Sequence, residues 1–278
     1  MNLSFRRRLQ LICFSLFFCG ITASLQSQDI DVPYVPTPHK VVEKMLDLSD
    51  VDSSDYVIDL GSGDGRIVIA AAKRGATGHG IELNPQYIAE ARQIAASQEV
   101  EGQVFFKKAD IFEASISGAS VITLYLLPSI NKKLRPRLLE ELRPGTRVVS
   151  HSFDMGGWKP DKKADIRPPN STRSHAIYYW VIPAGVEGDW HWSVGDRRFS
   201  MAISQQYQQI SVSIIDGDDR SYEIVDKNLK GDRISIRAKR GNTQYIFNGQ
   251  ISDNNIHGVV QYHSPEANRV MPWTARRP

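Results

Sequence analysis

A short glycine-rich segment holds the residues of this chain that are best suited to ligand chemistry. An apolar run, Val57 to Leu60, leads into Gly61-Ser62-Gly63-Asp64-Gly65-Arg66, and an apolar helix is expected directly after it. Glycine at alternate positions lets the backbone turn sharply and lets a ligand approach the main chain. Glu82 ends the next expected strand, where a doubly wound sheet places the carboxylate that binds a ribose diol. The spacing therefore predicts a site for a nucleotide-like cofactor.

Asp59 and the position of the third glycine indicate which class of nucleotide-like cofactor the site suits. The dinucleotide fingerprint, G-x-G-x-x-G, requires its third glycine one residue after Gly65, where this chain has Arg66. A carboxylate at Asp59 would repel a pyrophosphate but would suit a cofactor that carries a positive charge. The pattern D-x-G-x-G-x-G with a downstream acid resembles the S-adenosylmethionine (SAM) site of class I methyltransferases. A glycine turn alone also occurs for backbone reasons, so the prediction depends on the acids that accompany it.

Strands and helices are expected to alternate around this segment. We predict strands at 57–60, 78–82, 104–106, 121–125 and 147–150, and helices at 67–74, at 130–142 and from Asn84-Pro85 through Ala91. This α/β order predicts a Rossmann-like class I methyltransferase sheet with ligands at the carboxyl ends of its strands. Residues 176–182 are predicted to form the last strand of that sheet.

Asp110 and Ile111 closely follow the third expected strand. In this fold an Asp in that loop can accept a hydrogen bond from an adenine amino group. The next apolar residue can pack on the adenine ring and offer its backbone N–H. Asp110 is equally suited to capping a turn, so both interpretations stay open, with Asp110 and Ile111 kept as candidate cofactor contacts.

A wider resemblance covers roughly residues 33–161. The segments that carry it are Val32-Pro33-Tyr34-Val35-Pro36-Thr37-Pro38, then Asp59 through Ala72, then Gly80-x-Glu82-Leu83-Asn84-Pro85. They resemble a family of small protein-lysine methyltransferases that includes the mitochondrial enzymes acting on the ATP synthase c-subunit and the adenine nucleotide translocase. The resemblance implies that the proline-rich segment closes over the cofactor, so Tyr34 and Thr37 become candidate contacts, together with Leu83 of the third segment. The alternative is an extended X-Pro lead-in that merely packs on the sheet.

The end of the fourth strand bears on the methyl acceptor. Methyltransferases that act on exocyclic base nitrogens or amides usually present Asn or Asp followed by prolines and an aromatic residue there. This chain instead has Thr123-Leu124-Tyr125-Leu126-Leu127-Pro128, which disfavours DNA and glutamine as substrates. Transfer to lysine requires only a neutral amine, a channel that removes water from it, and alignment with the methyl donor. Tyr125 is a candidate for shaping this channel beside the cofactor, or it is a core residue at a strand end.

No residue is assigned as catalytic from the sequence. His151 and His175 invite a role as general base, but the sequence places no partner acid beside either one. No His/Cys cluster has metal-ligand spacing, so no metal is expected.

The charge of the chain is balanced outside its first 28 residues. Three of the 34 basic residues lie in residues 1–28, and the other 31 match the 31 acidic residues. A neutral chain lacks the electrostatic footprint of a protein that binds a nucleic-acid backbone, so no nucleic-acid partner is expected. Lys132, Lys133, Arg135 and Arg137 could form a local basic patch, although a solvated helix face is the plainer interpretation.

Three regions follow from composition. Residues 1–28 combine an arginine cluster, an apolar run and small residues, which is the form of a secretory signal or an N-terminal anchor. Residues 29–184 are predicted as the methyltransferase domain. Residues 185–278 alternate apolar and polar positions between glycine- and asparagine-containing turns, which predicts a small antiparallel β-sandwich or barrel. An exported or membrane-anchored location is therefore expected.

The sequence predicts a SAM-dependent methyltransferase whose acceptor is an amine, with a lysine of a protein substrate as the preferred acceptor. Two alternatives remain open: an exported protein of the same fold that binds without catalysis, and a small-molecule methyltransferase. An export signal in residues 1–28 conflicts with an active SAM-dependent enzyme, because SAM is made in the cytoplasm and an exported enzyme would need a supply of it. Oligomeric state and the ligand of the β region are not indicated by any motif.

Overall fold

The computed structural model describes residues 35–169 and 171–278. The segment 1–28 and Tyr34 lie outside the described residues. Within the described ranges, no helix combines the length and apolarity needed to cross a membrane.

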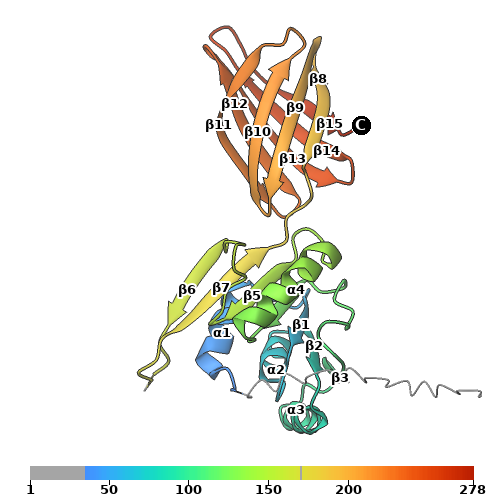
Figure 1. The fold of residues 1–278 in the computed structure, drawn as a ribbon, viewed down its shortest axis with the longest axis vertical. Coiled ribbons are helices and arrows are strands. Elements are labelled where there is room, and N and C mark those ends of the chain that lie inside the picture. Colours follow the sequence, from blue (N-terminus) through green and yellow to red (C-terminus); the bar gives the residue numbers. More distant parts are fainter. Residues whose placement is uncertain (1–34, 170) are drawn as a thin grey trace, which may run out of the picture. The chain divides into compact units, whose positions relative to one another are not determined.

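A seven-stranded sheet with helices on its faces forms the first part of the described chain (Figure 1). Its elements run α1 His39–Leu48, β1 Tyr56–Leu60, α2 Arg66–Ala72, β2 Thr77–Glu82, α3 Pro85–Ser97, β3 Val104–Lys108, β4 Val121–Leu124, α4 Pro128–Glu141, β5 Arg147–His151, β6 Lys162–Ile166 and β7 His175–Val181. The strand order is β3-β2-β1-β4-β5-β7-β6, and β7 pairs antiparallel with both neighbours. The predicted Rossmann-like sheet is confirmed.

The order of the strands reverses direction at β1, which lies between β2 and β4. In open α/β sheets ligands bind at such a switch point, outside the carboxyl ends of the strands. Leu60 pairs with Leu124 and Leu124 pairs with Ser150, so β1, β4 and β5 end at one edge. The glycine turn follows the end of β1, Tyr125 follows the end of β4, and Glu82 is the last residue of β2.

Strand β6 is the one element of this sheet that the sequence did not indicate. The last strand of this sheet along the chain is β7, His175–Val181, which confirms the strand predicted at 176–182. In space, however, the edge strand is β6, Lys162–Ile166. Its residues are exposed or half-buried, so it lacks the apolar pattern by which a strand is recognised.

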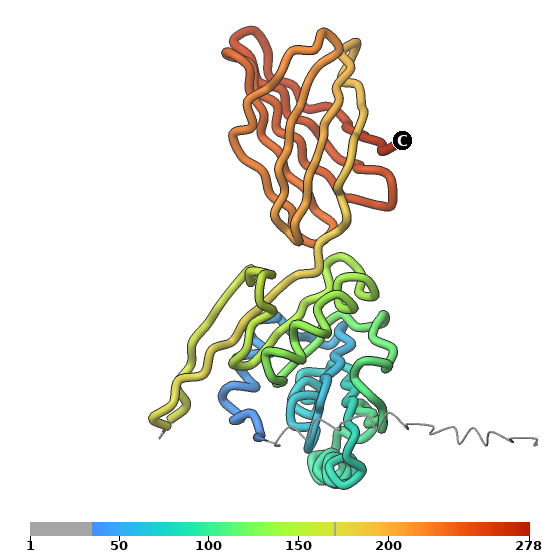
Figure 2. Tube along the Cα trace, in the orientation of Figure 1, coloured from blue at the N-terminus to red at the C-terminus, as the bar shows by residue number. Residues whose placement is uncertain are grey.

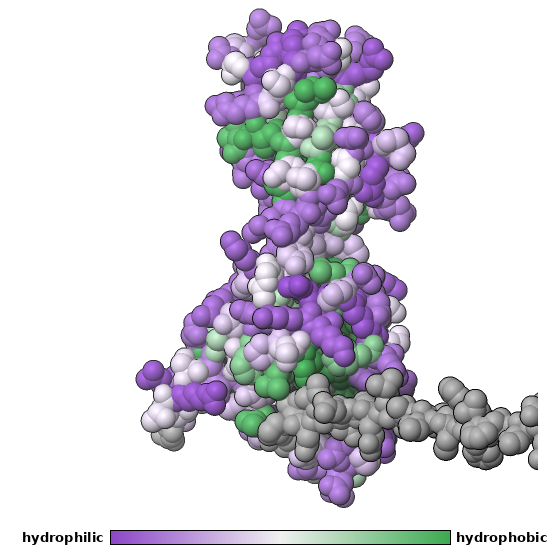
Figure 3. Space-filling model, viewed as in Figure 1, coloured by the Kyte–Doolittle hydropathy of each residue, from purple (hydrophilic) through white to green (hydrophobic). Residues whose placement is uncertain are grey.

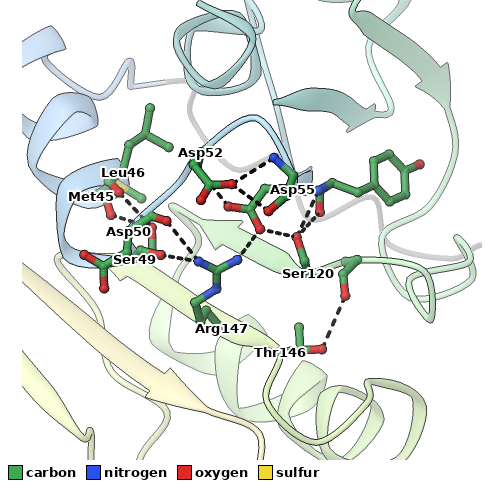
Figure 4. A network of polar contacts seen from close by, with 12 residues as sticks. Met45, Leu46, Ser49, Asp50, Asp52, Asp55, Ser120, Thr146 and Arg147 are labelled. Carbon is green, nitrogen blue, oxygen red and sulfur yellow. Dashed lines mark hydrogen bonds and ion pairs between the residues drawn. The ribbon is translucent and has the colours of Figure 1, made fainter. Parts of the chain in front are cut away.

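Opposite the switch point, a polar network joins α1, β1 and β5 at the amino ends of the strands (Figure 4). The Arg147 guanidinium donates to the carbonyl oxygens of Ser49, at 2.7 Å, and Asp50, at 3.1 Å, and is ion-paired with buried Asp55. Asp55 also accepts from the Ser120 hydroxyl at 2.7 Å. Because these groups are largely removed from water, the network fixes how α1 enters the sheet.

The second part is a closed barrel of eight antiparallel strands, which resolves the choice between sandwich and barrel. The strands are β8 Gly188–Val194, β9 Arg197–Gln206, β10 Gln209–Asp216, β11 Ser221–Lys230, β12 Arg233–Arg240, β13 Thr243–Ser252, β14 Asn255–His263 and β15 Asn268–Arg276. Each strand pairs with the next along the chain, and β15 closes on β8 (Figure 2). Closure removes the free edges at which strands aggregate.

Aromatic side chains fill the interior of the barrel. Trp190, Trp192 and Trp273 are at most 6% exposed and belong to one buried cluster, in which Trp192 stacks on Phe199 and Trp273 packs on Phe247. The Trp190 indole N–H donates to the Val186 carbonyl at 2.8 Å. These tryptophans therefore form part of the barrel core, while the barrel surface in the view of Figure 3 carries polar side chains around an apolar patch. The expected division at residues 184/185 stays a prediction.

Candidate functional site

The glycine turn adopts the backbone that its composition predicts. Gly61, Gly63 and Gly65 have φ of 81°, 51° and 77°, in the left-handed region that glycine enters without steric cost. A Cβ on Gly65 would lie 2.5 Å from the Phe106 ring, and one on Gly61 would lie 2.9 Å from Leu126. Backbone conformation therefore favours glycine at all three positions, steric contact adds to this at Gly61 and Gly65, and α2 begins directly after the turn.

Glu82 fixes the turn through backbone donors. Its carboxylate accepts from the Gly63 N–H at 2.9 Å through Oε2 and from the Asn84 N–H at 2.8 Å through Oε1. Each carboxylate oxygen can accept two hydrogen bonds, so both oxygens keep acceptor capacity for a ligand diol. Asn84 caps α3 by accepting from the Gln86 N–H at 2.9 Å, as the Asn-Pro sequence predicts. Leu83, between these two residues, is 56% exposed.

Asp59 is a buried acid at the centre of the switch point. It is 2% exposed and accepts from the Thr123 hydroxyl at 2.7 Å. The pKa of Asp59 is raised to about 7, chiefly by burial and also by the nearby charges of Glu82 and Asp64, while the Thr123 hydrogen bond opposes the shift. A cationic ligand would reverse this effect by favouring the ionised form.

Ser62 adds a buried polar group whose hydroxyl has no hydrogen-bond partner. Its side chain is buried and its hydroxyl makes no hydrogen bond in the structure. The backbone amides of Gly61 and Ser62 both donate to the Ile81 carbonyl, at 2.9 and 3.0 Å. Buried polar groups are normally satisfied, so the Ser62 hydroxyl indicates a position that a polar ligand group would complete.

Thr37 is held over the turn by Arg66. The Arg66 guanidinium donates to the Thr37 carbonyl at 2.9 Å and, through Nε, to Asp64 at 2.9 Å. Thr37 is 3% exposed, and its hydroxyl lies 3.1 Å from Nδ1 of His151. The structure thus places the end of the proline-rich segment at the site, with the Thr37 hydroxyl bonded to a histidine.

Asp110 and Ile111 lie next to Glu82, as expected for an adenine pocket. The Ala109 N–H donates to the Glu82 carbonyl at 3.2 Å, which brings the loop after β3 to the end of β2. Asp110 Oδ1 accepts from the Phe112 N–H at 2.8 Å, so this side chain does cap a turn. The turn cap and the adenine contact are compatible, because Oδ2 is the oxygen available to a ligand.

Tyr125 and two histidines form a cluster that sequence reasoning could not assemble. The Tyr125 ring centroid is 3.9 Å from that of His151, and Nε2 of His151 is 2.8 Å from Nδ1 of His175. Burial lowers the pKa of His151 to about 3. His151 ends β5 and His175 opens β7, and only the antiparallel pairing of these strands brings the rings together.

These features fit SAM. Asp59 and the glycine turn would hold its charged amino-acid tail, Glu82 its ribose, and Asp110 with Ile111 its adenine. Leu83 and Tyr125 are exposed or half-buried beside these groups, as contacts to a bound molecule require. In the described ranges, no group of three or more His, Cys, Asp or Glu residues is arranged to hold a metal ion.

Comparison with known proteins supports the assignment as a methyltransferase. The family model of the ANTKMT methyltransferase domain matches residues 59–162. A protein-lysine N-methyltransferase of Saccharolobus islandicus is 45% identical over 153 residues, which cover 54% of this chain and 94% of that protein. The human lysine N-methyltransferase of the ATP synthase c-subunit is 35% identical over 130 residues, 47% of this chain and 55% of that enzyme.

A solved structure extends the similarity to a bound product. The crystal structure of an RNA methyltransferase from Salinibacter ruber in complex with S-adenosyl-L-homocysteine is 52% identical, with a TM-score of 0.51. The match covers 55% of this chain and 96% of that one. S-adenosyl-L-homocysteine is what SAM becomes after it gives up its methyl group, so this neighbour supports SAM as the cofactor.

Proposed function

Because the chain belongs to the family of protein-lysine N-methyltransferases, we propose that its methyl acceptor is the side-chain amine of a lysine in a protein. It is a SAM-dependent methyltransferase, and the choice of acceptor is the part that requires proof. The observation that carries the proposal is the arrangement of Asp59, the glycine turn and Glu82 at the switch point of a sheet whose sequence resembles that family.

Each residue has a distinct task in this mechanism. SAM supplies an electrophilic methyl group next to a positive sulfur. Asp59 and Glu82 give the site the negative charge that suits such a cofactor, and the Arg66 guanidinium binds the Thr37 carbonyl. Tyr125 would border the channel of the acceptor amine. The enzyme gains rate mainly by orienting the two reactants and excluding water, which requires no covalent intermediate.

An acceptor in RNA is the alternative that the Salinibacter neighbour raises for this chain. Three features argue against it. Basic and acidic residues balance outside residues 1–28, and the cations of α4 are partly engaged: Arg137 donates to the Ile111 carbonyl at 2.6 Å, and Arg135 to the Met155 carbonyl at 2.7 Å. The end of β4 also lacks an Asn or Asp to hold a planar base amine.

The acceptor is tested with radiolabelled SAM and fractions of the host's own protein and RNA. The purified chain is incubated with each fraction, and methyl-lysine is mapped by mass spectrometry. Label that survives ribonuclease and is lost on proteolysis supports a protein acceptor. Label lost only with ribonuclease, or found only in small molecules, contradicts it. The Glu82→Ala variant is the control for SAM-dependent transfer.

We also propose that residues 1–28 direct the chain to the membrane or beyond it. The proposal rests on the arginine cluster and the apolar run of this segment. An anchor that faces the cytoplasm would leave the enzyme with its SAM supply, whereas export would require the cofactor to be bound beforehand. Cell fractionation, combined with the mass of the mature amino terminus, distinguishes these cases, and a cytosolic uncleaved product contradicts both.

A further inference from the structure

A continuous polar chain runs from the segment that covers the cofactor site to the edge of the sheet. The Thr37 hydroxyl lies 3.1 Å from Nδ1 of His151, and Nε2 of His151 lies 2.8 Å from Nδ1 of His175. Thr37 and His151 are buried, at 3% and 0% exposed, whereas His175 is 8% exposed. The chain thus has an inner end at Thr37 and an outer end at His175.

Contacts outside this hydrogen-bonded chain also place its inner end, Thr37, at the reaction site. Arg66, the first residue after the glycine turn, donates to the Thr37 carbonyl. Strand β5 leads to His151 at the carboxyl edge where β1 and β4 also end. The Tyr125 ring, which borders the proposed acceptor channel, packs against His151 with centroids 3.9 Å apart. Three elements therefore bring the chain of hydrogen bonds to the place where an acceptor amine must arrive.

Every member of this chain can donate one proton while it accepts another. A hydroxyl and a neutral imidazole each have one donor and at least one acceptor. The His151–His175 contact contains no carboxylate that would lock one tautomer, unlike the histidine–carboxylate pairs that fix a ring. We infer that Thr37, His151 and His175 form a proton relay that carries the proton of the substrate ammonium out of the closed active site.

The transfer balances atom by atom. The ammonium N–H bond breaks and its proton bonds to Thr37 Oγ1, while the hydroxyl proton moves to Nδ1 of His151. The Nε2 proton of His151 moves to Nδ1 of His175, and the Nε2 proton of His175 passes to water. The products are a neutral amine, three neutral protein groups with both tautomers exchanged, and one solvated proton. Between turnovers the reverse transfer, with water in the open pocket taking the proton from Thr37, restores the tautomers.

The surroundings of His151 and His175 disfavour a protonated, charged imidazole at either position. The pKa of His151 is lowered to about 3, first by burial and then by the charges of His175 and Arg173. The pKa of His175 is lowered by burial and by Arg173. In the register of the sheet, Ile177 pairs with His151 and Ile166 pairs with His175, and neither partner carries a charge. A charged imidazole is therefore disfavoured, and the proton moves by tautomer exchange.

The relay would remove the proton that a lysine acceptor must lose before methyl transfer, so this inference rests on the proposed function. A lysine side chain has a pKa of about 10.4, and only about one in a thousand is neutral at neutral pH. Nucleophilic attack needs the neutral amine, and a channel closed to water needs another exit for the proton.

His175→Asn is the decisive variant, since an amide at the Nδ1 position can keep the hydrogen bond to His151 but cannot pass a proton onward. We expect kcat near neutral pH to fall on the order of 100-fold, the size of a general acid–base contribution, with unchanged SAM affinity. The deficit should shrink as pH approaches about 10, where the lysine substrate becomes neutral in solution. The matched control is His79→Asn, which removes another half-buried histidine, bonded to the Tyr56 hydroxyl at 2.7 Å, and should leave kcat unchanged.

A purely structural role would give a different pattern. A deficit that is equal at all pH values, or that accompanies weaker SAM binding, overturns the relay, as does full activity of His175→Asn. Nitrogen NMR of the histidine side chains tests the relay even if wild type methylates no lysine, an outcome that would sink the proposed function alone. The relay requires both rings to be neutral and coupled across the His151–His175 hydrogen bond at neutral pH, and a protonated or uncoupled ring contradicts it.

Discussion

Replacing Asp59 by Asn should stabilise the cofactor-free protein at alkaline pH while it removes SAM binding. Asp59 is buried at the switch point, where the Thr123 hydroxyl is its neutral hydrogen-bond donor. An ionised carboxyl in such a place is costly without a cation beside it. Asn keeps the oxygen that accepts from Thr123 but carries no charge, so the variant separates the cost of the charge from the packing of the side chain.

The magnitude follows from the pKa of Asp59. It rises from 3.8 to about 7 in the folded protein, and three pKa units correspond to about 4 kcal/mol of lost stability once the group is ionised. The Asn amide adds a buried N–H donor that costs about 1–3 kcal/mol if it finds no partner. The net gain for Asp59→Asn is therefore about 1–3 kcal/mol above pH 7.

The effect of Asp59 on the stability of the wild-type protein changes with pH in a defined direction. Native Asp59 keeps its proton up to about pH 7, whereas the unfolded chain loses it near pH 3.8. The folded state thus binds more protons between these values, and Asp59 lowers wild-type stability as pH rises through this window and no further above it. Asp59→Asn lacks this contribution, so the variant should be about 1–3 kcal/mol less stable than wild type at about pH 4, through its buried amide, and its full advantage should be reached at about pH 8.

Urea unfolding of the cofactor-free protein, wild type and variant, across this pH range measures the difference. The control is Asp165→Asn, whose side chain is 58% exposed on β6 and should show no such trend. If Asp59→Asn is equally destabilising at both ends of the range, the buried carboxyl carries no charge cost, and the argument for a cationic ligand at this position fails.

Two further substitutions test the framework that positions the site. Gly65→Ala should cost about 2–4 kcal/mol, because φ is 77° and the added Cβ would press on Phe106; urea unfolding near that of wild type would show that the turn tolerates a side chain. Arg147→Met should cost about 3 kcal/mol by leaving Asp55 buried without its cation, and a wild-type unfolding midpoint would contradict the importance of the network in Figure 4.

The methyltransferase half of the fold was predictable because its local signals agree with its topology. The run from Val57 to Arg66 contains an apolar strand, a glycine turn and a helix start, and Asn84-Pro85 caps the following helix as its composition predicts. Strand β6 was missed because both of its faces are largely exposed and no apolar alternation marks it.

The cofactor residues could be predicted from local spacing, whereas the histidine chain could not. Asp59 and Glu82 lie a fixed number of residues from a recognisable turn. His151 and His175 are 24 residues apart, and their 2.8 Å contact depends on how β5 pairs with β7. Sequence spacing names candidate groups, but antiparallel pairing between distant segments decides which of them meet.

The central claim, a SAM site built on the glycine turn and Glu82, is tested most directly by calorimetric titration of SAM into the purified chain, with NAD as the control ligand. We expect saturable binding of SAM and none of NAD. Glu82→Ala should weaken SAM binding by about 1–3 kcal/mol through lost ribose hydrogen bonds, whereas Glu90→Ala, an exposed acid of the neighbouring helix, should not change it. Equal SAM affinity in the wild type and Glu82→Ala, or no SAM binding by the folded chain, would contradict the cofactor site.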